Sequence, residues 1–148
     1  MDSQLAVLIS TIAAAVSAVF AAVSSIMTYR QYRKSQLQKL SEKLAKILEI
    51  SVQYPYVENP GFTSQWENMK DTSDERYMRY DMYCNLLFNY WVDVYDYFGG
   101  NKKKIEEFVD IKNWIRLHRS NWQHPFVHGE NIDAYSPKFR KFIDSYIR

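Results

Sequence analysis

The residues best suited to chemistry are an arginine and a histidine near the end of the sequence, in Arg119-Ser-Asn-Trp-Gln-His124. An arginine can stabilise charge on a phosphate, and a histidine can transfer protons without a metal. On an unbroken helix, residues five positions apart point ~140° away from each other. His124 must therefore leave the helical path to meet Arg119. Pro125 favours this, because the residue before a proline avoids helical geometry.

The same pair also has a purely structural interpretation, in which Arg119 pairs with an acid and His124 caps a helix end. An arginine four to six residues before a histidine is expected by chance roughly 0.5 times in a chain like this one. Of the other histidines, His118 falls on an apolar stripe typical of a protein core. His128 lies beside Glu130, and two such groups do not make a metal site. The sequence contains no phosphate-binding glycine loop, nucleophile elbow or paired carboxylates, so we expect no cofactor and no metal.

The longest predicted element of the chain begins with an apolar run, Leu5–Tyr29, that has no charged side chain. Such a run can cross a bilayer core of ~30 Å, which takes ~20 apolar residues. A signal peptide fits less well, because the run is too long and Asp2 replaces the usual basic leader. Only Asp2 precedes the run, whereas basic residues follow it: Arg30, Arg33, Lys34, Lys39, Lys43 and Lys46. Positive charge stays in the cytoplasm, so we expect a single-pass protein of the inner membrane with a cytoplasmic C-terminal domain.

Small residues line one face of this run at seven-residue spacing, and we call this face the seam. Such residues let helix backbones approach closely and let hydroxyls bond across to a neighbouring helix. The pattern favours self-association, and a ring of such helices would place hydroxyls on the wall of a narrow water pathway. Alternatively, the hydroxyls bond to carbonyls of their own helix and the pattern is incidental. The seam consists of Ser10, Ala14, Ser17, Ala21, Ser24 and Thr28.

Beyond the run, the pattern predicts one continuous helix to about Gln53, broken by Pro55 and then by Asn59-Pro60-Gly61. The sequence thus divides into a short tail (1–4), a transmembrane helix (5–29), a juxtamembrane helix (30–54) and a cytoplasmic helical domain (55–148). The segment 62–70 is ambiguous, with Trp66 as its expected anchor. No alternating strand pattern of useful length occurs, so we predict an all-α fold.

Within the domain, the helical pattern predicts three longer elements. One starts at Thr72-Ser73-Asp74-Glu75 with a threonine cap and ends at Gly99-Gly100. It carries an apolar stripe of Tyr77, Tyr80, Cys84, Leu87, Trp91, Val94 and Phe98. A second amphipathic helix is expected from Ile105 to Trp122, followed by a loop through residues 128–131. A last short helix is capped by Ser136-Pro137.

Composition narrows the function classes. The net charge of +2 over 148 residues gives no global nucleic-acid signature, and the basic excess follows the apolar run, where topology explains it. One cysteine, Cys84, excludes an internal disulfide and a cysteine-rich zinc site, and its apolar position indicates an inert core thiol. The high aromatic content favours a dense helical core or an interface over a flexible tail.

Two resemblances add to these observations. The spacing of Arg119 and His124 resembles that of HEPN-type ribonuclease domains, small helical bundles whose sites usually combine motifs from two chains. At the position after the arginine, such motifs more often have a larger polar residue than Ser120. The whole arrangement resembles the small membrane accessory proteins of type VI-B CRISPR systems, with one N-terminal membrane helix, a helical domain and a divergent arginine–histidine motif. That resemblance implies a membrane ring that perturbs the envelope during antiviral defence.

Three functions therefore follow as hypotheses. The first is a homo-oligomeric, CRISPR-associated defence protein that forms or gates a pore in the bilayer through its seam. The second is a membrane-tethered, metal-independent ribonuclease that uses Arg119 and His124. The third is a non-catalytic anchor for a protein partner. The expected partners are a second copy of the chain, the lipid bilayer, and an RNA-guided effector or RNA.

Overall fold

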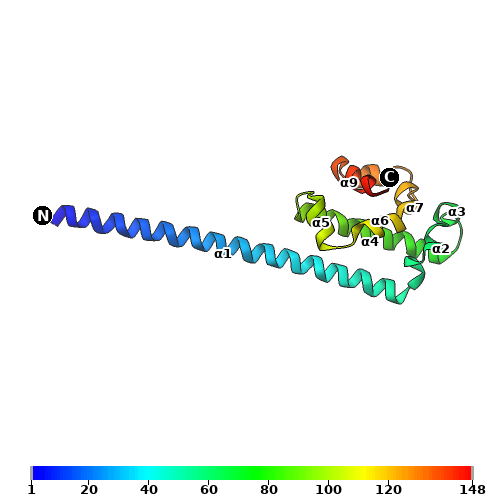
Figure 1. The fold of residues 1–148 in the computed structure, drawn as a ribbon, viewed down its shortest axis with the longest axis horizontal. Helices are drawn as coiled ribbons and strands as arrows, with labels where there is room; N and C mark the ends of the chain where they lie inside the picture. Colours follow the sequence, from blue (N-terminus) through cyan, green and yellow to red (C-terminus); the bar gives the residue numbers. More distant parts are fainter. Residues whose placement is uncertain (1, 148) are drawn as a thin grey trace. The chain divides into compact units, whose positions relative to one another are not determined.

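The fold is described from a computed structural model that covers residues 2–147, without the side chains of Asp2 and Ala6. The chain divides into two compact units, Met1–Lys39 and Leu40–Arg148. All regular structure in the described residues is helical, with no strand, so the all-α prediction is confirmed (Figure 1).

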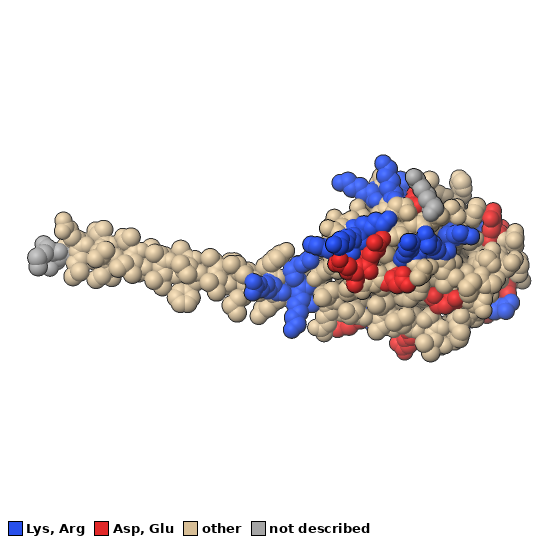
Figure 2. Space-filling view, in the orientation of Figure 1, with Lys and Arg blue, Asp and Glu red and all other residues tan. Residues whose placement is uncertain are grey.

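The first helix, α1, runs without a break over Asp2–Gln53 (Figure 1), as the apolar run and the heptad pattern after it predict. It ends where Tyr54 leaves helical geometry and Pro55 opens a short 3-10 helix, η1 (Pro55–Glu58). The most apolar part of α1 has a mean hydropathy of 2.4 and is 0% buried. Among the described residues, α1 is the one helix long and apolar enough to cross a membrane. Figure 2 shows its first part uncharged, with lysine and arginine only beyond it.

Two short helices follow η1, the first starting within the predicted loop at Asn59-Pro60-Gly61 and the second lying in the ambiguous segment 62–70. Helix α2 (Pro60–Thr63) begins at Asn59, whose side-chain oxygen accepts hydrogen bonds from the backbone N–H groups of Gly61 and Phe62. Helix α3 (Trp66–Met69) contains the expected anchor, because Trp66 is fully buried.

Helix α4 (Glu75–Tyr97) is the central helix of the domain, and most of the predicted stripe is buried. Its cap differs from the prediction: Asp74, not a threonine, accepts a hydrogen bond from the N–H of Arg76. Thr72 instead donates to the carbonyl of Met69. The predicted end is confirmed, since Gly99 and Gly100 follow α4 with φ of 61° and 71°, which favours glycine. The buried residues of α4 are Tyr77, Tyr80, Tyr83, Cys84, Leu87, Phe88, Tyr90, Trp91 and Val94.

The helix predicted from Ile105 to Trp122 is wrong, because the structure divides it into three. They are α5 (Lys102–Phe108), α6 (Ile111–Leu117) and α7 (Arg119–Gln123). The first break occurs because Val109 is extended and the Asp110 side chain caps α6 by accepting from the N–H of Asn113. The second occurs at His118, which leaves helical geometry and is fully buried. The apolar period was right, since Ile105, Ile111 and Ile115 are buried.

The last two helices complete the domain. The predicted loop at 128–131 is partly wrong, because α8 (Glu130–Ala134) starts within it, after Gly129 at φ 84°. Helix α9 (Pro137–Ile147) begins as expected, and the Ser136 hydroxyl accepts a hydrogen bond from the N–H of Phe139. Helix α9 packs on α6 and α8 and contributes to the aromatic core through Phe139, Phe142, Ile143 and Tyr146.

Candidate functional site

Arg119 and His124 stand at the two ends of α7. Arg119 is its first residue, placed there because the chain turns at His118 between α6 and α7. His124 follows its last residue, with φ −126° and ψ 63°, so it leaves the helical path before Pro125 as the sequence predicts. His124 therefore occupies the helix-end position that the structural interpretation gave it. In the described part of the chain, no acid forms an ion pair with Arg119.

Helix α3 holds the end of α7 in place. The indole N–H of Trp66 donates to the backbone carbonyl of His124 at 2.7 Å, and Lys70 Nζ donates to the carbonyl of Pro125 at 3.2 Å. The imidazole Nε2 of His124 lies 3.4 Å from a carboxylate oxygen of Glu67, also in α3. A carboxylate at this distance can orient the imidazole ring.

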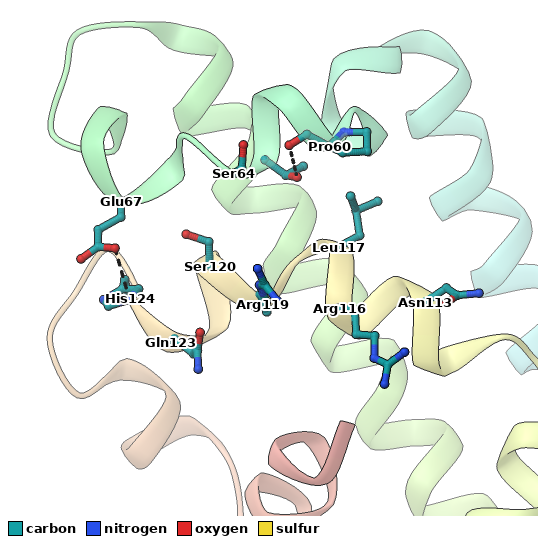
Figure 3. A pocket seen from close by; sticks show the side chains of 11 residues that line it. Pro60, Ser64, Glu67, Asn113, Arg116, Leu117, Arg119, Ser120, Gln123 and His124 are labelled. Atoms are coloured by element: carbon teal, nitrogen blue, oxygen red, sulfur yellow. Dashed lines mark hydrogen bonds and ion pairs between the residues drawn. The ribbon is translucent and has the colours of Figure 1, made fainter. Parts of the chain in front are cut away.

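Arg119 and His124 line the same pocket, which has a volume of about 590 Å³. Figure 3 shows Glu67 and His124 at one end, Asn113 at the other, and Arg119 between them. One wall comes from α2 and α3 and the opposite wall from α6 and α7. The lining residues are Pro60, Thr63, Ser64, Glu67, Asn113, Arg116, Leu117, Arg119, Ser120, Gln123 and His124. The fold therefore brings the two residues of the sequence motif to one cavity, while their catalytic role stays a prediction.

A buried polar network that sequence reasoning missed lies beside this pocket. His118, expected as a satisfied core histidine, has 0% exposure, and its Nδ1 lies 3.1 Å from the hydroxyl of Tyr80. Its Nε2 lies 3.4 Å from a carboxylate oxygen of Glu58 in η1, an ion-pair distance. That same oxygen accepts a short hydrogen bond from the Tyr83 hydroxyl. No sequence pattern predicts the contacts of Glu58, because it follows a loop proline and its partners are at least 25 residues away in the chain.

The network shifts the acidity of its members. Burial raises the pKa of Glu58, but the nearby His118 and the hydrogen bond from Tyr83 lower it by more, so the net pKa lies below its ordinary value. Cys84, fully buried within 3.8 Å of His118 Nδ1, has its pKa raised well above the usual value by burial. A neutral, inaccessible thiol is unreactive, which agrees with the predicted inert core cysteine.

The seam residues all lie on the exposed surface of α1. The hydroxyl of Ser10 donates to the carbonyl of Val7 at 2.8 Å, and Ser25, beside the seam, donates to Ala21 at 2.8 Å. Bonding back to the helix, the alternative considered from the sequence, is therefore what Ser10 does in the isolated chain. Such a hydroxyl keeps lone pairs that can accept a bond from a neighbouring helix.

The described residues contain no cluster of three or more histidine, cysteine or acidic side chains that could hold a metal ion. His128 is exposed in the turn before α8.

Comparison with known proteins gives one match. A family described as "Family of unknown function (DUF6082)" matches residues 4–109, which covers α1 to the end of α5. No curated protein and no solved structure matches the chain. The matched region includes the seam and Glu58 but stops before α6 and α7, so Arg119 and His124 lie outside it.

Proposed function

The chain belongs to the DUF6082 family of unknown function, and we propose that it is a single-pass membrane protein that self-associates through the seam and forms or gates a pore. The observation that carries this proposal is the apolar part of α1, with a mean hydropathy of 2.4 and 0% burial. Such a surface is stable only in lipid or against another apolar helix. The basic residues after the run favour an inner-membrane protein with the domain in the cytoplasm.

Self-association follows from the chemistry of the seam. In a bilayer, helices gain no hydrophobic energy by meeting, so close packing of small residues and hydroxyl hydrogen bonds decide which faces meet. A seven-residue repeat keeps one face in contact when helices supercoil with a left-handed twist. If more than two helices meet with the seam inward, Ser10, Ser17 and Ser24 line the space between them, which favours a water pathway.

The biological setting, antiviral defence beside an RNA-guided effector, is proposed on the resemblance of architecture to type VI-B accessory proteins. The family match gives no link to those systems or to HEPN domains. Its test is whether co-expression with a type VI-B effector increases protection of cells against an RNA-targeted phage. Equal protection with and without the protein would remove this setting and leave the membrane function to be tested separately.

The test of the pore is leak of a small dye from liposomes that contain the purified full-length protein. We expect wild type to leak and Ser10→Leu/Ser17→Leu/Ser24→Leu to leave the vesicles tight while still inserting. A control, Ala15→Leu/Ala22→Leu, adds leucine side chains ~120–140° around the helix from the centre of the seam and should still leak. Tight vesicles with wild type at any protein density would contradict the pore.

A ribonuclease is the second candidate, favoured by the joint position of Arg119 and His124 on one pocket with Glu67 beside the imidazole. Arg119 would stabilise charge on the phosphate, and His124 would transfer the proton. Cleavage of single-stranded RNA in EDTA, lost in Arg119→Ala and His124→Ala and kept in the seam variant, would support it. If purified protein neither leaks nor cleaves, the third hypothesis, an anchor for a protein partner, is the one to pursue.

A further inference from the structure

The pocket beside α7 is lined by two arginines and, among the described residues, by one acid. Arg116 and Arg119 both line it, and no acid in the described residues forms an ion pair with either guanidinium. Arg116 donates through Nε to the carbonyl of Tyr146 at 3.2 Å, which fixes its stem and leaves its terminal N–H groups for another acceptor. Among the described lining residues, Glu67 is the single acid, and it already lies 3.4 Å from His124.

The remaining polar groups of the pocket suit the recognition of a small oxyanion. Ser120 and Gln123 present a hydroxyl and a side-chain amide from α7, on the same wall as Arg119 (Figure 3). Ser64 adds a hydroxyl from the opposite wall, where it donates to the carbonyl of Gly61 and keeps its lone pairs. The guanidinium fork matches the oxygens of a carboxylate or a phosphate, and two such groups with neutral donors around them favour the doubly charged phosphate over a singly charged carboxylate.

Size and composition separate a small phosphorylated ligand from a nucleic-acid strand. A volume of about 590 Å³ lies within the ~300–1,000 Å³ range of small-molecule sites. Single-stranded RNA is usually held by aromatic side chains that stack on its bases. None of the described lining residues is a phenylalanine, tyrosine or tryptophan, although the chain is rich in them, and the one ring, that of His124, lies beside Glu67.

We infer that this pocket binds a small phosphomonoester, such as a sugar phosphate, with Arg119 as the main phosphate contact and Arg116 as the second. The ligand would bridge α2 to α6 and α7. The residue before Arg119, His118, contacts Glu58 of η1, the element that precedes α2. Binding of this kind does not require a pore, and it stands or falls separately from leak or RNA cleavage.

The test is isothermal titration of the full-length protein in lipid nanodiscs with ribose 5-phosphate, with ribose as the ligand without phosphate. We expect ribose 5-phosphate to bind and ribose not to bind. Arg119→Gln should weaken binding at least about tenfold, because it removes a charge-assisted hydrogen bond, and Arg116→Gln should weaken it several-fold. Lys112→Gln removes the same charge from α6 at an exposed residue that does not line the pocket, and it should bind as wild type does.

Three results would overturn the inference. They are no heat of binding at millimolar ribose 5-phosphate, equal loss in Lys112→Gln and Arg119→Gln, and binding of a single-stranded RNA oligomer alone. The last result would favour the ribonuclease. Because Arg119 is exposed, Arg119→Gln should fold normally, and an unchanged thermal unfolding curve without ligand confirms that its loss of binding is local. Inorganic phosphate, titrated last, should compete with ribose 5-phosphate in wild type.

Discussion

Helix α1 contains two regions that differ in their apolar pattern and in their burial, residues 5–29 and residues 40–53. In the first, residues such as Ile12 and Phe20 are 56% and 69% exposed. In the second, Leu40 and Ile47 are each 5% exposed and belong to the core of the domain. A helix apolar on all sides has no water-facing side, whereas the second region alternates buried and charged positions. Apolar content alone predicts that a helix needs burial. The distribution of its apolar residues around the helix axis predicts whether protein on one side or lipid on all sides will bury it.

The largest effect is expected from charges in the first region. Val16→Arg/Val19→Arg should cost about 5–7 kcal/mol of insertion, at ~2.5–3.5 kcal/mol per arginine near the helix centre. The protein should then move from the membrane to the soluble fraction after carbonate extraction. Val127→Arg, at an exposed apolar position of the domain, is the control and should stay in the membrane. Equal extraction of both variants would remove the lipid interpretation of the first region.

The same substitution in the two regions gives the sharpest comparison. Ile47→Ala should lower the free energy of unfolding of the domain by about 2–4 kcal/mol, because it leaves a cavity in a packed core. Ile12→Ala, on the same helix but exposed, should leave domain unfolding unchanged. Thermal unfolding followed by tryptophan fluorescence measures both, since Trp66 and Trp91 are fully buried in the domain. A comparable loss in Ile12→Ala would mean that the first region also packs on protein.

A smaller, pH-dependent effect is expected where η1 joins α1 to the domain. The pKa of Glu58 is lower in the folded protein than its ordinary value of 4.5, so its stabilisation is present above that value. It is lost as the pH falls through the folded pKa. Glu58→Gln should cost about 1–3 kcal/mol at pH 7 and much less under acid conditions.

Denaturant unfolding of wild type and Glu58→Gln at pH 7 and below pH 4 measures whether the difference between their free energies of unfolding shrinks in acid. Glu107→Gln, at an exposed ion pair with Lys103, should differ from wild type at neither pH. If wild type and Glu58→Gln differ equally at both pH values, the charge of Glu58 does not stabilise the fold.

The smallest effect is expected at the ion pair between α1 and α4. Lys43 and Asp93 are in contact at 2.5 Å, but their side chains are 57% and 41% exposed. An exposed pair of this kind contributes about 0–1 kcal/mol. Lys43→Met should therefore change the free energy of unfolding by less than Ile47→Ala does, and raising the salt concentration should reduce the effect further. A loss above 2 kcal/mol would show that charge, not burial, fixes the second region of α1.

The sequence by itself predicted the helices that carry a long, regular period. The uncharged run and the heptads after it predicted α1 to Gln53, and the stripe from Tyr77 to Val94 predicted α4 with its glycine end. Local rules were enough there, because an apolar pattern repeated over many turns outweighs the effect of any single neighbour. They failed between Ile105 and Trp122, where Asp110 caps a new helix and His118 turns inward.

Only the tertiary structure decided the surroundings of the candidate site. The spacing of Arg119 and His124, with Pro125 after it, predicted that the histidine leaves the helical path. Nothing local could place Glu67 and Trp66 of α3 against it, nor Glu58 against His118 across 60 residues of chain. Such contacts depend on packing between segments distant in sequence, where burial and hydrogen bonding are set by partners that a periodic pattern does not encode. The sequence determined which helix faces are apolar and must be buried, and the tertiary structure decided which side chains contact one another.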